Sequence, residues 1–420
     1  RCLVGSEMCI RDSMKILHTS DWHLGHSLFN RKRTNEQQAF LLWLKETIKA
    51  KKIDALLVSG DVFDSSIPGN QAQELYYHFL GTLASDTACR RVIIVAGNHD
   101  SASFIEAPKA VLQSLKVNVI GRARQNIQEE VIEINDSFGQ QLLVCAVPYL
   151  RDKDLCISRQ GETSQERESR ILKAIRDHYR QVLDDAIKRK KHQKVPIVAM
   201  GHLYVSGSIT KERLLGQADP LYVGSLGQVP IDIFPKDFHY VALGHIHLAQ
   251  KVGEDDRIQY SGSPLPLNFS EVNNQRRVVL VEFSEKGERK IEYIDVPLFQ
   301  ELVQIKGNWE HIEQQIIRLK QKKSQAWVEV VYESSVVMGD LRARVLKLIE
   351  SSSLEVLRIK NTQVIKEALS HRTTPKDLQQ LTPMDVFEFC LQDRQVDNDQ
   401  RPLLREYYLK ALRELQSSED

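Results

Sequence analysis

The sequence is poor in cysteine and has no closely spaced cysteine pair. The six cysteines among its 420 residues are scattered along the chain: Cys2, Cys9, Cys89, Cys145, Cys156 and Cys390. A disulfide scaffold or a structural zinc site needs clustered cysteines, so the sequence argues against both. The scattered thiols fit a reducing compartment, and we expect a cytoplasmic protein.

A long hydrophobic run and an excess of one charge are also missing. No apolar stretch approaches the roughly 20 residues that a membrane-spanning helix needs, which argues against a membrane protein. The 57 lysine and arginine residues nearly balance the 56 aspartate and glutamate residues, giving a formal net charge of +1. Any binding of nucleic acid must therefore depend on local basic patches.

The first thirteen residues, RCLVGSEMCIRDS, do not have the pattern of a signal peptide. They lack a basic segment followed by a long apolar stretch. We interpret residues 1–13 as an extraneous segment ahead of Met14 and leave them out of the fold prediction.

Short apolar runs alternate with amphipathic stretches over residues 14–290. Six runs have the length and the flanking turn residues of buried strands: Lys15–Thr19, Ala55–Ser59, Val92–Ala96, Leu142–Val147, Ile197–Met200 and Tyr240–Leu243. Four stretches have helical periodicity: Asn35–Lys51, Gln71–Leu83, Pro108–Leu115 and Ser164–Lys191. This alternation predicts a layered α/β domain.

A second unit is predicted at residues 296–365, where strand and helix patterns alternate as βαβαβ. Its expected elements are Leu302–Lys306, Trp309–Lys322, Trp327–Tyr332, Asp340–Glu350 and Leu354–Ile359. Within residues 376–420, two further helices are expected, Met384–Gln392 and Pro402–Gln416.

Five short clusters of aspartate, histidine and asparagine follow the predicted strands of the first unit. They are Asp21-Trp22-His23, Gly60-Asp61-Val62-Phe63-Asp64, Gly97-Asn98-His99-Asp100, Gly201-His202 and Gly244-His245-Ile246-His247. Because folds of this class bind ligands at the carboxyl ends of their strands, we expect the clusters to meet in one site.

The residue types in these clusters suit a pair of divalent cations. Phosphodiester hydrolysis needs hydroxide at neutral pH and positive charge beside the phosphate oxygens, and two cations about 3.5–4 Å apart supply both. The carboxylate of Asp61 can bridge two cations, and neutral imidazoles complete the ligand shells without cancelling the positive charge. A set of oxygen and nitrogen ligands without thiolate favours Mn²⁺ or Fe²⁺, allows Zn²⁺ and disfavours Ca²⁺. We expect two divalent cations, with Mn²⁺ as the working ion.

Each cluster taken alone also has a structural interpretation. A lone Asp-x-His or Gly-Asp pair is more often a capped turn than a ligand, and Asn98 suits a left-handed turn position. The occurrence of all five in this order, each just past a predicted strand, favours the metal site.

The order DxH, GDxxD, GNHD, GH, GHxH resembles that of the calcineurin-like metallophosphoesterases. Within that superfamily, KILHTSDWHLG, SGDVFD, VAGNHDS and ALGHIHLAQ with YSGSPLPLNFSE are similar to the bacterial SbcD family of DNA-repair nucleases. The resemblance implies a DNA exonuclease and endonuclease. It also implies that one cation is held by Asp21, His23, Asp61 and His247, and the other by Asp61, Asn98, His202 and His245. His99 would act on the scissile phosphate or the leaving oxygen, with Asp100 close enough to orient its ring.

One position departs from part of this superfamily. Archaeal and eukaryotic relatives carry histidine at the last position of the second motif, where this chain has Asp64. The bacterial branch also has aspartate there, so the resemblance to a nuclease stands. A catalytic role that those relatives give to this histidine is not expected of Asp64.

The resemblance implies an α/β fold: a layered metallophosphoesterase β-sandwich flanked by helices, a small βαβαβ capping domain and C-terminal helices. The C-terminal helices would dock on an SbcC-like ATPase. Met384–Gln392 carries more apolar side chains than one small helix needs, although packing on the capping unit would also explain them. A homodimer through the nuclease domain and a location in the bacterial cytoplasm are further expectations from the resemblance.

Arg31, Lys32 and Arg33 follow the first motif and are candidate contacts to the DNA backbone. The basic run Lys188–Lys191 ends a predicted helix, and we interpret it as a solvated helix end.

Two other functions fit the same clusters. The first is a phosphatase or cyclic-nucleotide phosphodiesterase, which would leave the capping unit and the apolar terminal helix without a purpose. The second is a non-catalytic scaffold with a relic site, against which the complete ligand set argues.

Overall fold

The computed structural model describes residues 13–135, 139–155, 163–208, 228–334 and 338–361, together with positions 384, 387–388, 391, 401–405 and 407–409. Residues 1–12 of the segment expected to be extraneous lie outside the described residues, whereas Ser13 belongs to the first strand. Every helix within the described ranges is too short or too polar to cross a membrane.

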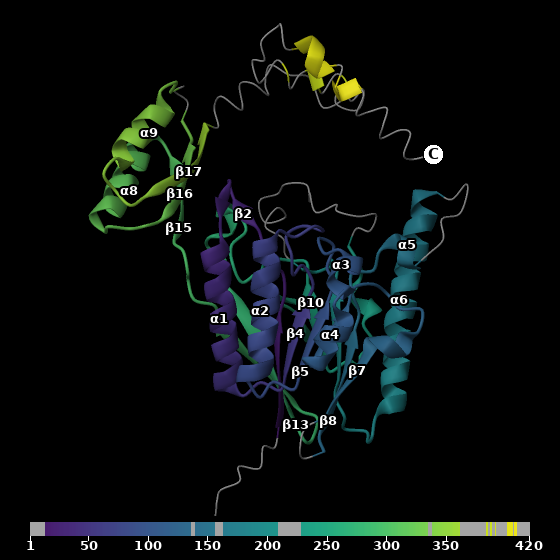
Figure 1. Cartoon of the computed structure of the whole chain (residues 1–420). Coiled ribbons are helices and arrows are strands. Elements are labelled where there is room, and N and C mark those ends of the chain that lie inside the picture. Colours follow the sequence, from purple (N-terminus) through teal and green to yellow (C-terminus); the bar gives the residue numbers. More distant parts are fainter. Residues whose placement is uncertain are drawn as a thin grey trace, which may run out of the picture.

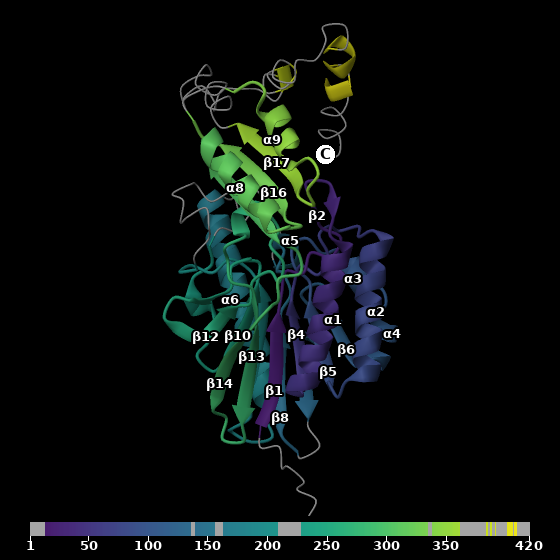
Figure 2. The ribbon, with the colours of Figure 1, turned by 90° about the vertical axis from the view of Figure 1, so that its left-hand side faces the viewer.

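Two six-stranded sheets form the centre of the molecule (Figures 1 and 2). The first has the order β14 (Arg289–Asp295), β13 (Arg277–Ser284), β1 (Ser13–Thr19), β4 (Ala55–Ser59), β5 (Arg91–Val95), β6 (Val117–Ile120). The second has the order β11 (Gln250–Val252), β12 (Asp255–Tyr260), β10 (Tyr240–Gly244), β9 (Ile197–His202), β8 (Gln141–Ala146), β7 (Val131–Asn135).

The central strands are apolar on both faces because each face is covered. Leu57 of β4 packs between the two sheets, whereas its neighbours Leu56 and Val58 pack against the helices. Successive side chains of a strand point to opposite faces, so the buried run Ala55–Ser59 serves two cores at once.

Helices cover the outer faces of the sandwich, in four layers (Figure 1). On the first sheet lie α1 (Thr34–Lys51), α2 (Asn70–Asp86), α3 (Ala102–Glu106) and α4 (Lys109–Ser114). On the second sheet lies α6 (Ser164–Arg189), preceded by α5 (Asp152–Leu155). The Thr163 hydroxyl and Glu166 form a capping box that fixes the start of α6.

The predicted elements of this domain are confirmed to within a few residues. The predicted strand Ala55–Ser59 has the observed bounds, and the predicted helix Ser164–Lys191 ends two residues earlier, at Arg189. The two facing sheets confirm the β-sandwich that the resemblance implied. Strands β6, β7 and β11 to β14, and the assignment of each strand to one of the two sheets, were not predicted from the sequence.

Within each sheet, the strands that precede the five clusters run parallel to one another. β1, β4 and β5 run parallel in the first sheet, and β9 and β10 run parallel in the second. Their carboxyl ends therefore reach the same end of the sandwich, where the clusters follow them.

The capping unit is a three-stranded parallel sheet with two helices on one face. Its elements are β15 (Leu302–Gly307), α8 (Trp309–Gln321), β16 (Trp327–Tyr332), α9 (Leu341–Ile349) and β17 (Glu355–Asn361). This is the predicted βαβαβ order. The unit lies above the short hairpin of β2 (Ser27–Leu28) and β3 (Arg31–Lys32) (Figure 2).

Most of the predicted C-terminal helices Met384–Gln392 and Pro402–Gln416 lies outside the described residues. The described positions bring the two segments together. The rings of Phe387 and Tyr408 stack with centroids 4.0 Å apart, and Arg405 forms an ion pair with Glu388.

Candidate metal centre

The first two clusters are joined through their backbones. The amide of Asp21 donates to the carbonyl of Gly60 at 3.0 Å, and that of His23 donates to the carbonyl of Asp61 at 3.0 Å. These two bonds lie just past the ends of β1 and β4, which are neighbouring parallel strands. The backbone therefore fixes the side chains of Asp21, His23 and Asp61 relative to one another.

Four candidate ligands have a left-handed backbone, which residues with a Cβ rarely adopt. The φ angles are 53° at Asp21, 45° at His23, 49° at Asp61 and 94° at His245. Such strain costs about 1–3 kcal/mol per residue and persists where the surrounding structure and function require it. These four strained residues all belong to the predicted site.

Two glycines allow the loops to approach closely. A Cβ on Gly60 would lie 2.2 Å from Nδ1 of His202, and a Cβ on Gly97 would lie 2.1 Å from Oδ1 of Asp61. Neither position accepts a side chain without displacing a candidate ligand. The glycine that opens these clusters is therefore required by packing around the site.

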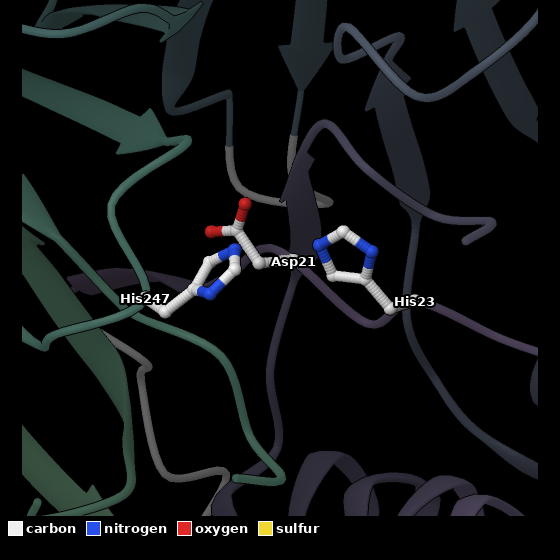
Figure 3. A group of neighbouring side chains, drawn as sticks. All are labelled: Asp21, His23 and His247. Carbon is white, nitrogen blue, oxygen red and sulfur yellow. The ribbon is translucent and has the colours of Figure 1, made fainter. Parts of the chain in front are cut away.

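Asp21, His23 and His247 form one group whose potential ligand atoms all lie within 4.8 Å of one another. The carboxylate of Asp21 lies beside the His247 ring, and the His23 ring lies on the other side of Asp21 (Figure 3). The ring centroids of His23 and His247 are 5.2 Å apart. This group brings together residues from the first and the fifth cluster.

Asn98, His202 and His245 form a second group. Oδ1 of Asn98 lies 3.0 Å from Nε2 of His202 and 2.9 Å from Nδ1 of His245. Nδ1 of His202 faces the carbonyl oxygen of Ser59 at 2.9 Å, which directs Nε2 into the site.

Asp61 lies between the two groups. Its Oδ2 is 3.3 Å from Nε2 of His202 and 3.7 Å from Nε2 of His23, and all three side chains are buried. Nε2 of His23 has no hydrogen-bond partner among the described residues. A buried, unpaired imidazole nitrogen beside a carboxylate fits a cation ligand, as does the set of oxygen and nitrogen donors without thiolate. The site thus fits two cations that share Asp61.

The electrostatics of the site match a place for cations. Burial alone would lower the pKa of His202, but the neighbouring carboxylate of Asp61 raises that pKa to about 9. Burial alone would raise the pKa of Asp61, but His202 and His23 hold it far below its usual range. Burial and the nearby His202 lower the pKa of His245 to about 3.

Cation binding is therefore expected to release protons. Without cations, His202 is protonated at neutral pH, and coordination requires its neutral form. Near pH 7.5 we expect the release of about one proton per chain from this residue, and the release should vanish as the pH rises past 9. Calorimetric titration with Mn²⁺ in two buffers of different ionisation enthalpy measures this number. An observed enthalpy that is the same in both buffers near pH 7.5 would contradict the expectation.

Two carboxylates outside the expected ligand set orient the histidines. Oδ1 of Asp64 lies 3.2 Å from Nδ1 of His23, and Oε1 of Glu271 lies 3.3 Å from Nδ1 of His247. A carboxylate on the far nitrogen of a ligating histidine fixes the tautomer and the ring orientation. Glu271 was not predicted from the sequence, although the residue ends the quoted motif YSGSPLPLNFSE, which was the available signal.

His99 and Asp100 take different positions. His99 is exposed, its backbone amide donates to Oδ1 of Asp61 at 2.9 Å, and its ring Nδ1 lies 2.9 Å from the backbone carbonyl of Asp64. Asp100 is buried, and its carboxylate accepts hydrogen bonds from the backbone amides of Gly97, Val62 and Phe63. The expected orientation of the His99 ring by Asp100 is corrected: Asp100 joins the backbones of the second and third clusters, and Asp64 contacts the ring.

The three basic residues that were candidates for DNA contact, Arg31, Lys32 and Arg33, differ in their surroundings. Arg33 is buried, its Nε donates to Oε1 of Glu36 at 2.8 Å, and its Nη1 donates to the carbonyl of Pro266. The expectation that Arg33 contacts DNA is therefore wrong, because its guanidinium is enclosed in the fold. Arg31 is half-exposed and pairs with Glu355 of the capping unit at 2.8 Å, and Lys32 is exposed.

Replacement of Arg33 by alanine is expected to act on stability. Removal of one partner of a buried ion pair leaves the other charge uncompensated, so the free energy of unfolding should fall by about 3–5 kcal/mol. The ion pair of Arg31 is exposed, so Arg31→Ala should lower the free energy of unfolding by no more than about 1 kcal/mol. Denaturant unfolding of both variants measures the difference, and equal losses would show that burial of Arg33 has no energetic role.

Comparisons with known proteins agree with this geometry. The calcineurin-like phosphoesterase family model matches residues 14–249, and a model described as the type 5 capsule protein repressor C-terminal domain matches residues 298–395. The SbcD subunit of the nuclease SbcCD from Escherichia coli K12 is 32% identical over 404 residues, which cover 96% of this chain and 98% of that protein. The same-named protein of Rhodobacter capsulatus is 35% identical over 64% of this chain and 67% of its own.

Proposed function

This chain belongs to the calcineurin-like phosphoesterases and, within them, to the family of SbcD subunits of the nuclease SbcCD. It is therefore a metal-dependent phosphodiesterase of the nuclease type. From this premise we propose that it is a two-cation DNA exonuclease and endonuclease that hydrolyses phosphodiester bonds at DNA ends or hairpins. The observation that carries the proposal is the position of the Asp61 carboxylate between His23 and His202.

The proposed ligands divide between two cations, which we propose to be Mn²⁺. One would be held by Asp21, His23, Asp61 and His247, and the other by Asp61, Asn98, His202 and His245. When bound, the cations would supply positive charge to the phosphate oxygens and activate water for attack. The backbone hydrogen bonds of Asp21 to Gly60 and of His23 to Asp61 support the positions of three of these ligands.

His99 would act on the substrate rather than on a cation. Its ring is exposed, and the contact of Nδ1 with the Asp64 carbonyl leaves Nε2 as the nitrogen that can face a bound phosphodiester. If Nδ1 donates to that carbonyl, the neutral ring can accept a proton at Nε2, and the charged ring can donate one to the leaving oxygen. Asp64 would hold the ring in this orientation.

The protein would work in a complex of the SbcCD type. The relatives are named as one subunit of the nuclease SbcCD, and the C-terminal family model extends over the first predicted terminal helix. We propose that residues 376–420 dock on an SbcC-like ATPase, that two copies of the chain form a homodimer, and that the complex acts in DNA repair in the bacterial cytoplasm. Lys32 is exposed, whereas Arg31 pairs with Glu355 and Arg33 is buried, so we propose Lys32 as the one of these three basic residues that contacts a DNA backbone.

The test compares substrates under one set of conditions. The full chain, with and without its ATPase partner, is given blunt duplex DNA, hairpin DNA, p-nitrophenyl phosphate and cyclic nucleotides in Mn²⁺, and then a chelator. We expect DNA cleavage that the chelator abolishes. Rapid turnover of the small esters with intact DNA would favour a phosphatase instead, and no turnover of any substrate would favour a scaffold.

A further inference from the structure

The capping unit rests on a small platform at the metal end of the sandwich. We define the platform as the β2–β3 hairpin, residues 27–32, together with η3 (Phe269–Glu271). Leu28 and Phe269 of the platform share one apolar cluster with Leu302 and Trp327 of the capping unit. This shared cluster joins the two units through buried side chains.

Two contacts of exposed side chains extend this junction. In the first, the guanidinium of Arg358 lies 4.7 Å from the centroid of the Phe29 ring, which itself stacks on the ring of Phe269 with centroids 5.8 Å apart. In the second, Arg31 pairs with Glu355 at 2.8 Å. The outer strand β17 therefore contacts the hairpin through Glu355 and Arg358.

His26, one residue ahead of the hairpin, connects the platform with a candidate cation ligand. Its Nδ1 lies 3.0 Å from Oδ1 of Asp64, the same oxygen that contacts His23, and its Nε2 lies 3.0 Å from the carbonyl oxygen of Leu267. The His26 ring thus spans from the carboxylate that orients His23 to the loop that leads into η3.

The contacts continue from that loop to the second histidine of the same group. The amide of Leu267 donates to Oε2 of Glu271 at 3.1 Å, and Oε1 of Glu271 contacts His247. His23 and His247, the two imidazoles of one group, are therefore both oriented by residues that border or belong to the platform.

The other group is supported differently. His202 is held by the carbonyl oxygen of Ser59 at the end of β4, and the backbone amide of His245 donates to Oδ1 of Asp21 at 3.0 Å. Ser59 ends β4. Asp21 belongs to the first group, but it lies just past the end of β1 and its amide is bonded to Gly60, so neither support involves the platform. Displacement of the platform would therefore disturb the His23 and His247 group far more than the Asn98, His202 and His245 group.

We propose that His26 is a positioning residue that couples the seating of the capping unit to one cation site of the pair, the site of Asp21, His23 and His247. The inference rests on the two-cation function proposed above. Loss of a direct contact to the second ring nitrogen of a ligating histidine typically changes metal affinity by about 10- to 100-fold. His26 acts one contact further out, through Asp64, so we expect an effect of up to about 10-fold, which is measurable. A movement of the capping unit would then alter one cation site and leave the other intact.

The first test removes the connecting ring. Mn²⁺ is titrated into the full-length wild type and into His26→Ala, and free Mn²⁺ is followed by its electron paramagnetic resonance signal. The wild type should bind two ions. The variant should bind one of them more weakly, by up to about 10-fold, and the other unchanged. His192→Ala, which replaces an exposed histidine in the turn after α6, is the control and should bind both ions as the wild type does.

The second test acts from the capping side, where the change does not touch any proposed ligand. Arg358→Ala removes the contact with Phe29, together with a 3.8 Å ion pair to Glu329, with which Lys360 also pairs. It should weaken the same single site by about two- to fivefold, as expected for the loss of one exposed cation–π contact. Arg344→Ala removes a comparable contact, with Trp309 on the helical face of the capping unit, and should leave both sites unchanged. Because Arg358 is partly exposed, this variant keeps the test valid even if His26→Ala fails to fold.

The outcomes separate the inference from the proposed function. Equal weakening of both sites, or of neither, in His26→Ala overturns the positioning role. An Arg358→Ala variant that binds Mn²⁺ like Arg344→Ala overturns the coupling to the capping unit. A wild type that binds fewer than two ions overturns the two-cation function itself, before any variant is compared.

Discussion

Replacement of Asp61 by asparagine is expected to reduce DNA cleavage by at least about 1000-fold, which corresponds to about 4 kcal/mol of transition-state stabilisation. The change keeps the size of the side chain and removes its charge. Oδ2 of Asp61 faces both His23 and His202, so its carboxylate is placed where two cations could share it. Initial rates of duplex cleavage in Mn²⁺ measure the loss.

The same variant should also bind fewer than two Mn²⁺ ions per chain, because two cations cannot lie close together without an anionic ligand between them. Asp86→Asn is the matched control, since Asp86 is an exposed carboxylate that pairs with Lys45 at 3.0 Å. It should cleave DNA at the wild-type rate. An Asp61→Asn variant that retains both ions and full activity would remove Asp61 from the centre of the mechanism.

Replacement of His99 by alanine should reduce cleavage by about 100- to 10,000-fold, the usual contribution of a general acid or base. In contrast to Asp61→Asn, this variant should keep both cations. The reason is that the His99 ring is exposed and held by the Asp64 carbonyl rather than enclosed by the ligand groups. Cleavage rates and Mn²⁺ stoichiometry measured on the same preparation test both statements.

The stoichiometry decides between two roles for His99. Its ring also lies within 4.8 Å of potential ligand atoms of His23 and Asp61, so the geometry alone permits a cation ligand. Loss of one ion from His99→Ala would assign it that role and contradict the proposed one. His78→Ala, in the exposed face of α2, serves as the control for replacement of a surface histidine.

The site was predictable where a residue and its strand are neighbours in sequence. Asp21 and Asp61 come directly after apolar runs that form parallel strands, so the strand pattern already implied that they meet. The pattern of apolar residues could not assign each strand to one of the two sheets of the sandwich, since the assignment depends on which of two buried faces each strand shares with a distant partner. Periodicity does not distinguish those faces in a strand that is apolar on both.

The supporting residues escaped prediction because their roles depend on contacts across long separations in the chain. Glu271 contacts His247 24 residues away, and His26 contacts Asp64 38 residues away. The prediction that Arg33 contacts DNA was wrong for a different reason. Its neighbours Arg31 and Lys32 suggested an exposed basic patch, but the start of α1 places Glu36 where it encloses the Arg33 guanidinium. Charge in a sequence does not reveal burial.

Anomalous diffraction from crystals grown with Mn²⁺ tests the shared position of Asp61 most directly. We expect two peaks about 3.5–4 Å apart, one on each side of the Asp61 carboxylate, with His23 and His247 at one peak and His202 and His245 at the other. A single peak, or two peaks that do not share Asp61, would contradict a pair of cations bridged by this carboxylate.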